Sequence, residues 1–132
     1  MTRREIRENT FKLVFNMEFR TPDEYEEQFD LYMNEKTDIN DDDKSYIKTR
    51  LFDLCAKKED IDELIASASE GWDIGRIGKV ELAILRLATY EAKFDEDIPV
   101  SVAINEAVEI AKKYGGEDSP AFINGILGKL VS

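Results

Sequence analysis

The chain has 132 residues, 42% of them hydrophobic and 36% charged, so it can build one packed core and does not have the composition of a disordered chain. It contains no histidine and a single cysteine, Cys55, which excludes an internal disulfide, a Cys-rich zinc site and nucleophiles activated by histidine. The net charge of −11 argues against a general nucleic-acid binder.

The charge is unevenly distributed along the chain. Residues 1–20 carry a net charge of +2, whereas residues 21–70 carry −10. The first segment is therefore a small basic island, and we expect any polyanion to bind there locally with help from a partner. No apolar run approaches the ~20 residues that span a bilayer, and none follows the N-terminal charges as in a secretory signal. We therefore expect a cytoplasmic protein.

The first half of the chain has helical spacing of apolar residues. A first helix is predicted over residues 2–19, and a second begins at Thr21 with Pro22 in its first turn and Glu24 closing a capping box. Asn40 and the three aspartates after it are predicted to open a third helix. The predicted buried stripes of these helices are Ile6, Thr10, Leu13, Val14 and Met17; Tyr25, Phe29, Tyr32 and Met33; and Ile47, Leu51, Leu54 and Cys55.

The second half continues the helical pattern. A fourth helix carries Ile61, Leu64, Ile65 and Ala68 and is predicted to end at Gly71. Residues 80–90, VELAILRLATY, are apolar on nearly every side, as in a helix buried at the centre of a fold.

Two more helices complete the predicted set. The sixth is expected to start at Pro99 and to end at Gly115-Gly116, and the seventh to be capped by Ser119 with Pro120 in its first turn. The fold class predicted is all-α, a compact bundle of about seven helices in two packed subdomains, with residues 1–132 as a single domain.

The first helix carries a second stripe beside its core face. Arg4, Arg7, Phe11 and Phe15 fall within an arc of about 80° at ~100° per residue. Arginines bind phosphates, and exposed aromatic rings stack on RNA bases. Aromatic residues at helical spacing more often pack against a second layer of helices. From the residues alone both readings stay open.

Several single residues outside the first helix could have either a functional or a structural role. Arg76 and Lys79 extend the basic island if the start of the fifth helix lies beside the first helix. Arg86 lies in an apolar helix, and because an unpaired buried charge is costly, we expect it to bind a carboxylate such as Glu106 or Glu109. Trp72 is predicted to be a core anchor or a lid over helix ends.

Three segments together resemble the NusB family. They are WDIGRIGKVELAILRLATYE (72–91), IPVSVAINEAVEIAKKYG (98–115) and SPAFINGIL (119–127). They occur in the family's order and at its spacing, and cover roughly residues 72–127. The first helix matches more loosely, and position 15 is Phe where the family often has Tyr.

The resemblance implies more than the spacing does. NusB proteins are all-helical, pair with the small-subunit ribosomal protein NusE, and bind boxA RNA in antitermination complexes with RNA polymerase and other Nus factors that support ribosomal RNA transcription. It therefore implies that Arg4, Arg7 and Phe15 on the first helix are partly exposed and functional. The residues expected to contact RNA are Arg3, Arg4, Arg7, Arg76, Lys79 and Phe122. Those expected near the partner are Phe15, Glu81 and Asp118. No cofactor or metal is expected.

Two other functions were weighed. A NusB-like domain also occurs at the N-terminus of some RNA cytosine methyltransferases, but this sequence has no glycine-rich cofactor loop, so we expect no enzyme. The alternative is a non-enzymatic protein-interaction module whose acidic segment 21–70 binds basic partners.

Overall fold

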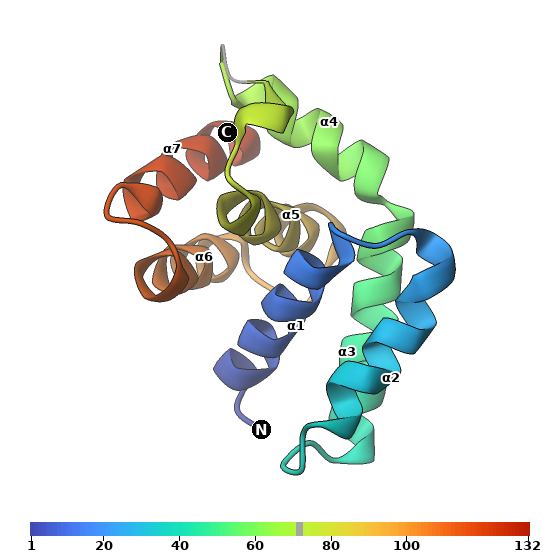
Figure 1. Ribbon diagram of the computed structural model, residues 1–132. Coiled ribbons are helices and arrows are strands. Elements are labelled where there is room, and N and C mark those ends of the chain that lie inside the picture. The colour runs from blue at the N-terminus through green and yellow to red at the C-terminus, as the bar shows by residue number, and fades with distance from the viewer. Residues whose placement is uncertain (71–72) are drawn as a thin grey trace.

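The computed structural model describes residues 1–70 and 73–132. Within them the chain forms seven α-helices and two single 3-10 turns, with no strand (Figure 1). The helices are α1 (Arg3–Met17), α2 (Tyr25–Asn34), α3 (Asp41–Ala56), α4 (Lys58–Ala68), α5 (Lys79–Phe94), α6 (Val100–Tyr114) and α7 (Ser119–Val131). The prediction of an all-α bundle of about seven helices is confirmed.

Helix α5 is the centre of the fold, as its sequence predicted. Every residue from 82 to 91 is buried. It contacts α1, α4, α6 and α7, and Figure 1 shows it nearly end-on between α1 in front and α6 and α7 to the side. Because apolar side chains project from all sides of α5, each neighbour can bury its own apolar stripe against it.

The core extends without a break across all seven helices. The predicted stripes supply most of it, and Leu13, Ile47, Ile65 and Leu127 are each fully buried. Five predicted stripe residues are half-buried and pack against its edge: Ile6, Tyr25, Tyr32, Cys55 and Leu64. Helices α1, α2 and α3 pack on one another and α6 packs on α7, while α5 contacts both groups.

The predicted starts of α1 and α3 are confirmed. The predicted Thr21–Glu24 capping box opens the 3-10 turn Pro22–Glu24, and α2 itself begins only at Tyr25. The Thr2 hydroxyl accepts a hydrogen bond from the Glu5 amide at 3.1 Å, and the Glu5 carboxylate accepts one from the Thr2 amide at 2.9 Å. Asn40 caps α3 by accepting from the Asp43 amide at 2.8 Å. These contacts satisfy amides that a helix N-terminus leaves unpaired.

Two predictions about helix ends have a different outcome. The cap of α7 is Asp118, and Ser119 is instead the first helical residue, with its hydroxyl accepting from the Gly116 amide at 3.0 Å. The prediction that Ser119 caps this helix is therefore wrong by one residue. Gly71 and Trp72, predicted as a helix terminator and a core anchor, lie outside the described residues.

None of the described helices is both long and apolar enough to cross a membrane.

Candidate nucleic-acid interface

The outer ridge of α1 carries charged and aromatic residues that the core does not use. Its members are Arg4, Glu8, Lys12, Phe15 and Phe19, the last lying just beyond the C-terminal end of the helix. At ~100° per residue they fall within about 80° of arc. Arg4 and Phe19 on this ridge are exposed, whereas Glu8, Lys12 and Phe15 are half-buried.

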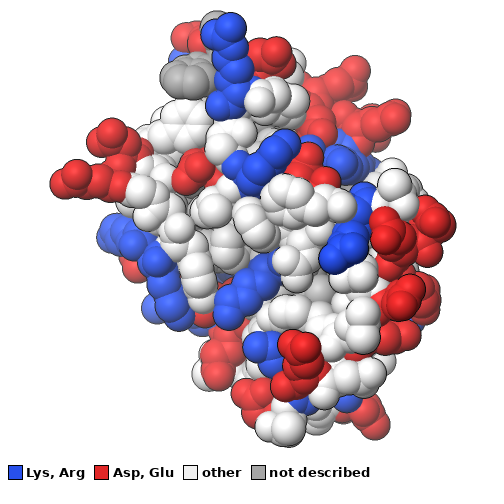
Figure 2. All heavy atoms as spheres, in the orientation of Figure 1, with Lys and Arg blue, Asp and Glu red and all other residues white. Residues whose placement is uncertain are grey.

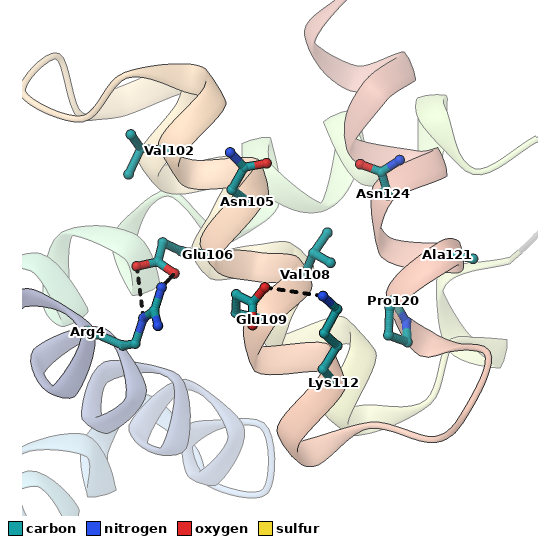
Figure 3. Close-up of a pocket in the computed structure, with 10 residues that line it drawn as sticks. All are labelled: Arg4, Val102, Asn105, Glu106, Val108, Glu109, Lys112, Pro120, Ala121 and Asn124. Carbon is teal, nitrogen blue, oxygen red and sulfur yellow. Dashed lines mark hydrogen bonds and ion pairs between the residues drawn. The ribbon is translucent and has the colours of Figure 1, made fainter.

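Arg4 is exposed but not free. Its Nε and Nη2 donate to the two carboxylate oxygens of Glu106 on α6, at 3.2 and 2.9 Å (Figure 3). This hydrogen bond, with the charge of Glu106, raises the pKa of the Arg4 guanidinium. The pair lies beside an open groove of about 700 Å³ between α6 and α7. An anion that binds Arg4 must therefore compete with Glu106.

The expectation that Arg7 is partly exposed is wrong. Its Nε donates to both oxygens of Glu91 at 3.0 Å, and only 9% of the Arg7 side chain is accessible. Arg50 of α3 approaches the same carboxylate at 3.6 Å. Burial nevertheless raises the pKa of Glu91, since desolvation outweighs the two guanidinium groups. The packing of α1 on α5 turns position 7 inward, which leaves no surface there for RNA.

The two aromatic residues of the predicted stripe have different environments. Phe11 is buried and packs on Tyr114 of α6, with ring centroids 5.2 Å apart. Phe15 is half-buried and meets Phe19 edge to face at 5.2 Å. Phe19 itself is 58% exposed. The packing reading therefore holds for Phe11, while Phe15 and Phe19 present aromatic surface to solvent.

Lys79, at the start of α5, lies against the C-terminal end of α1. Its Nζ donates to Glu18 at 3.3 Å, and its side chain remains 47% exposed. Arg76 is exposed in the 3-10 turn Ile74–Arg76 just before it. The start of α5 therefore lies beside α1, as was required for Arg76 and Lys79 to extend the basic island.

Arg86, buried in α5, binds the carboxylate of Glu18. The Arg86 guanidinium donates to Asp62 of α4 through two bonds of 2.9 Å, and also to Glu18. The prediction of a buried, paired arginine is confirmed, but the predicted carboxylates, Glu106 and Glu109, are wrong. Helix α5 turns position 86 towards α1 and α4, away from α6. Burial opposes ionisation of Glu18, yet its bonds to Arg86 and Lys79 lower its pKa.

A second contact joins the starts of α5 and α7. The Ser119 hydroxyl donates to the half-buried Glu81 carboxylate while accepting from the Gly116 amide. Glu81, predicted near the partner, thus also fixes the position of α7. Asp118 is exposed beside it, and Phe122 is half-buried against the core one turn further along.

These two contacts bring together residues from three separate segments. We call the surface formed by Phe15, Phe19, Arg76, Lys79, Asp118 and Phe122 the α1–α5–α7 face. In Figure 2, viewed from the side of α1, basic side chains lie scattered among uncharged ones, while most acidic side chains gather near the rim. Arg4 stands apart, about 16 Å along the helix axis from Phe15. Arg3 is exposed about 100° around α1 from Arg4.

The sequence reading missed several residues of this surface. Phe19 belongs to the face but lies just beyond α1, and the sequence analysis did not identify it. Lys12 and Lys113, outside the face, were counted only as charge. The described residues include no group of three or more metal-ligating side chains. The arrangement offers charge and aromatic surface for binding.

The sequence matches known proteins along its whole length. The model of the NusB family matches residues 4–132. The transcription antitermination protein NusB of Lachnoclostridium phytofermentans is 49% identical over 131 residues, covering 99% of this chain and 99% of that protein. Similarity of this extent confirms the family resemblance and indicates a transcription antitermination protein, not an enzyme.

Solved structures of the same family match the fold. NusB of T. maritima superposes with a TM-score of 0.87 at 36% identity, covering 99% of this chain and 91% of that one. A crystal structure of the antitermination factors NusB and NusE in complex with dsRNA matches with a TM-score of 0.83 at 27% identity, covering 98% and 95% of the two chains. In that relative, a NusB chain is bound in one assembly with a protein and an RNA.

Proposed function

This chain belongs to the NusB family of transcription antitermination proteins, and we propose that it binds boxA-type RNA together with the ribosomal protein NusE. The complex would act with RNA polymerase and other Nus factors in transcription of ribosomal RNA. We further propose that residues 1–132 work as one helical domain in the cytoplasm, where bacterial RNA polymerase acts. The continuous core across all seven helices supports the single domain.

The observation that carries this proposal is the assembly of the α1–α5–α7 face. The Lys79–Glu18 contact holds the start of α5 against the end of α1, and the Glu81–Ser119 contact holds α7 against α5. Basic and aromatic side chains from three segments therefore share one surface. Single-stranded RNA is bound by this combination, because ammonium and guanidinium groups neutralise phosphates while rings stack on bases.

The overall charge explains why a partner is needed. A chain of net charge −11 repels a polyanion at long range, whereas salt screens charges beyond about 8 Å at physiological ionic strength. RNA can thus be held locally at Arg76 and Lys79, and contacts from a basic partner would add to a weak intrinsic affinity. We assign Arg3 and Arg4 to peripheral RNA contacts, and Phe15, Glu81 and Asp118 to the border with NusE. Arg7 is given a structural role.

The test is a fluorescence anisotropy titration of a boxA-type RNA oligonucleotide, with and without purified NusE. We expect weak binding by the chain alone and tighter binding with NusE. The double variant Arg76→Glu with Lys79→Glu should lose most of this affinity.

A matched control reverses two lysines elsewhere. Lys93 lies in the last turn of α5, about 20 Å from Lys79 along the helix, and the Nζ of Lys57 lies 5.9 Å from the ring of Phe94 at the same end. Their reversal adds the same negative charge and should leave RNA binding close to wild type. Equal loss in both double variants would show a net-charge effect without a defined site. Equal affinity for boxA and scrambled RNA in the presence of NusE would favour the protein-interaction module.

A further inference from the structure

Two lysines from different helices lie over the half-buried ring of Tyr114. The Nζ of Lys12 on α1 lies 5.7 Å from the ring centroid of Tyr114 on α6, and that of Lys113 lies 5.4 Å from it. Phe11 supports the same ring from the core side at 5.2 Å. The ring is therefore held in place, with two ammonium groups beside it. We call Lys12, Lys113 and Tyr114 the lysine–tyrosine cluster.

The two ammonium groups differ in their other contacts. Lys113 donates to both oxygens of Glu8 at 3.0 Å, and the Tyr114 hydroxyl donates to the same carboxylate at 3.2 Å. Among the described residues, Lys12 has no carboxylate within ion-pair distance. The cluster thus contains one ammonium without a carboxylate partner and a second that the half-buried Glu8 carboxylate neutralises.

The cluster continues the α1–α5–α7 face. Lys12 precedes Phe15 by three residues and Phe19 by seven, so all three lie on one ridge of α1. Tyr114 is followed directly by Gly115 and Gly116, which lead to Asp118 at the start of α7. The lysine–tyrosine cluster therefore lies next to the aromatic residues, on the side towards Arg4.

We propose that Lys12 and Lys113 bind consecutive parts of an RNA phosphate backbone across Tyr114, which extends the RNA path from the α1–α5–α7 face along α1. The proposal rests on the proposed function, since it lengthens that binding surface. A phosphate can replace the Glu8 carboxylate at Lys113, because both present oxygens to the same ammonium donor. Lysines act here as mobile point charges, which suits contacts to a backbone and not to a particular base.

The experiment measures the salt dependence of RNA binding. A boxA-type single-stranded RNA oligonucleotide is titrated with the chain and NusE between 50 and 200 mM salt. Each phosphate contact contributes about 0.7 to the slope of log K against log salt for a single strand. The double variant Lys12→Ala with Lys113→Ala should therefore reduce the slope by about 1.4 and bind several-fold more weakly. The control Lys57→Ala with Lys93→Ala has the same net charge and should keep the wild-type slope.

A third variant tests the same cluster by a gain of affinity. Glu8→Gln removes the carboxylate that neutralises Lys113, so RNA should bind more tightly than to wild type at low salt. Circular dichroism and urea unfolding of each variant separate a folding defect from a binding defect.

The outcomes separate the two proposals. Wild-type binding with NusE, together with an unchanged slope in the Lys12 and Lys113 double variant, overturns the extended path and leaves the proposed function in place. The same double variant could also keep the wild-type salt slope but bind NusE more weakly in the absence of RNA. That result would assign the cluster to the protein partner and would also overturn the extended RNA path. No RNA binding by the wild type overturns both.

Discussion

Arg7 of α1 and Glu91 of α5 form a buried ion pair in which one guanidinium nitrogen lies 3.0 Å from both carboxylate oxygens. Glu106 and Arg50 lie at 3.5 and 3.6 Å from the two members, so charged groups of four helices meet at this point. The pair fixes how α1 sits on α5. It also determines which side of α1 remains available for ligands.

Replacing Arg7 should mainly lower the free energy of unfolding, because its role is structural. Arg7→Ala leaves Glu91 buried with only Arg50 nearby, and removing one partner of a buried pair typically costs about 3–5 kcal/mol. Urea unfolding followed by circular dichroism measures this. Arg3→Ala, at an exposed position on the same turn, should change the free energy of unfolding by no more than about 0.5 kcal/mol. Equal, small effects of both variants would contradict a structural role for Arg7.

The pair of Glu18 with Arg86 should make stability depend on pH. The folded pKa of Glu18 lies below its ordinary value of 4.5, so its contribution is present above pH 4.5 and is lost as pH falls through the lowered pKa. Glu18→Gln removes this contribution at every pH. The difference in unfolding free energy between wild type and Glu18→Gln should be constant near neutral pH and shrink below pH 4.5. A difference that stays the same down to pH 3 would contradict this assignment.

Two glycines in the C-terminal part of the chain, one at the end of α6 and one within α7, should respond in opposite directions to alanine. A Cβ on Gly115 would lie 2.6 Å from the Ser119 Cβ and Oγ and 2.9 Å from the Ala111 carbonyl oxygen. Because Ser119 is bound to Gly116 and Glu81, it cannot move freely, and we expect Gly115→Ala to cost about 1–3 kcal/mol. Gly125 lies within α7 with open space around it, so Gly125→Ala should stabilise by about 0.5–1 kcal/mol. Thermal unfolding of both variants decides this, and a destabilising Gly125→Ala would show that α7 needs the glycine for another reason.

Phe19 should matter for binding and little for stability. Its ring is 58% exposed, so Phe19→Ala should change the unfolding free energy little. If the ring stacks on a base, the same variant should weaken RNA binding by about 1–3 kcal/mol in the anisotropy titration with NusE. Phe11→Ala is the contrasting variant, since its ring is buried and its loss should unfold the chain more readily. Wild-type RNA affinity in Phe19→Ala would remove Phe19 from the proposed interface.

Periodicity and cap residues in the sequence were sufficient to predict the helices. The starts of α1 and α3 depend on contacts between residues three apart, Thr2 with Glu5 and Asn40 with Asp43, and a similar Thr21–Glu24 contact opens the 3-10 turn before α2. The burial of α5 follows from its composition, because a helix that is apolar on every side is stable only when it is surrounded by other helices. The family resemblance rests on residues 72–127, which include this central helix.

The site could be predicted only in part, because exposure depends on which helices become neighbours. Arg4 and Arg7 are both basic and are one turn apart, so the sequence treats them alike. The packing of α1 on α5 buries Arg7 against Glu91, while Arg4 reaches out to Glu106. Likewise, the carboxylates expected for Arg86 were the wrong ones, because the packing of α5 turns position 86 towards Asp62 of α4 and Glu18 at the end of α1. Local chain chemistry thus determined the helices, whereas the relative placement of those helices decided which charges are buried, which are paired and which remain for a ligand.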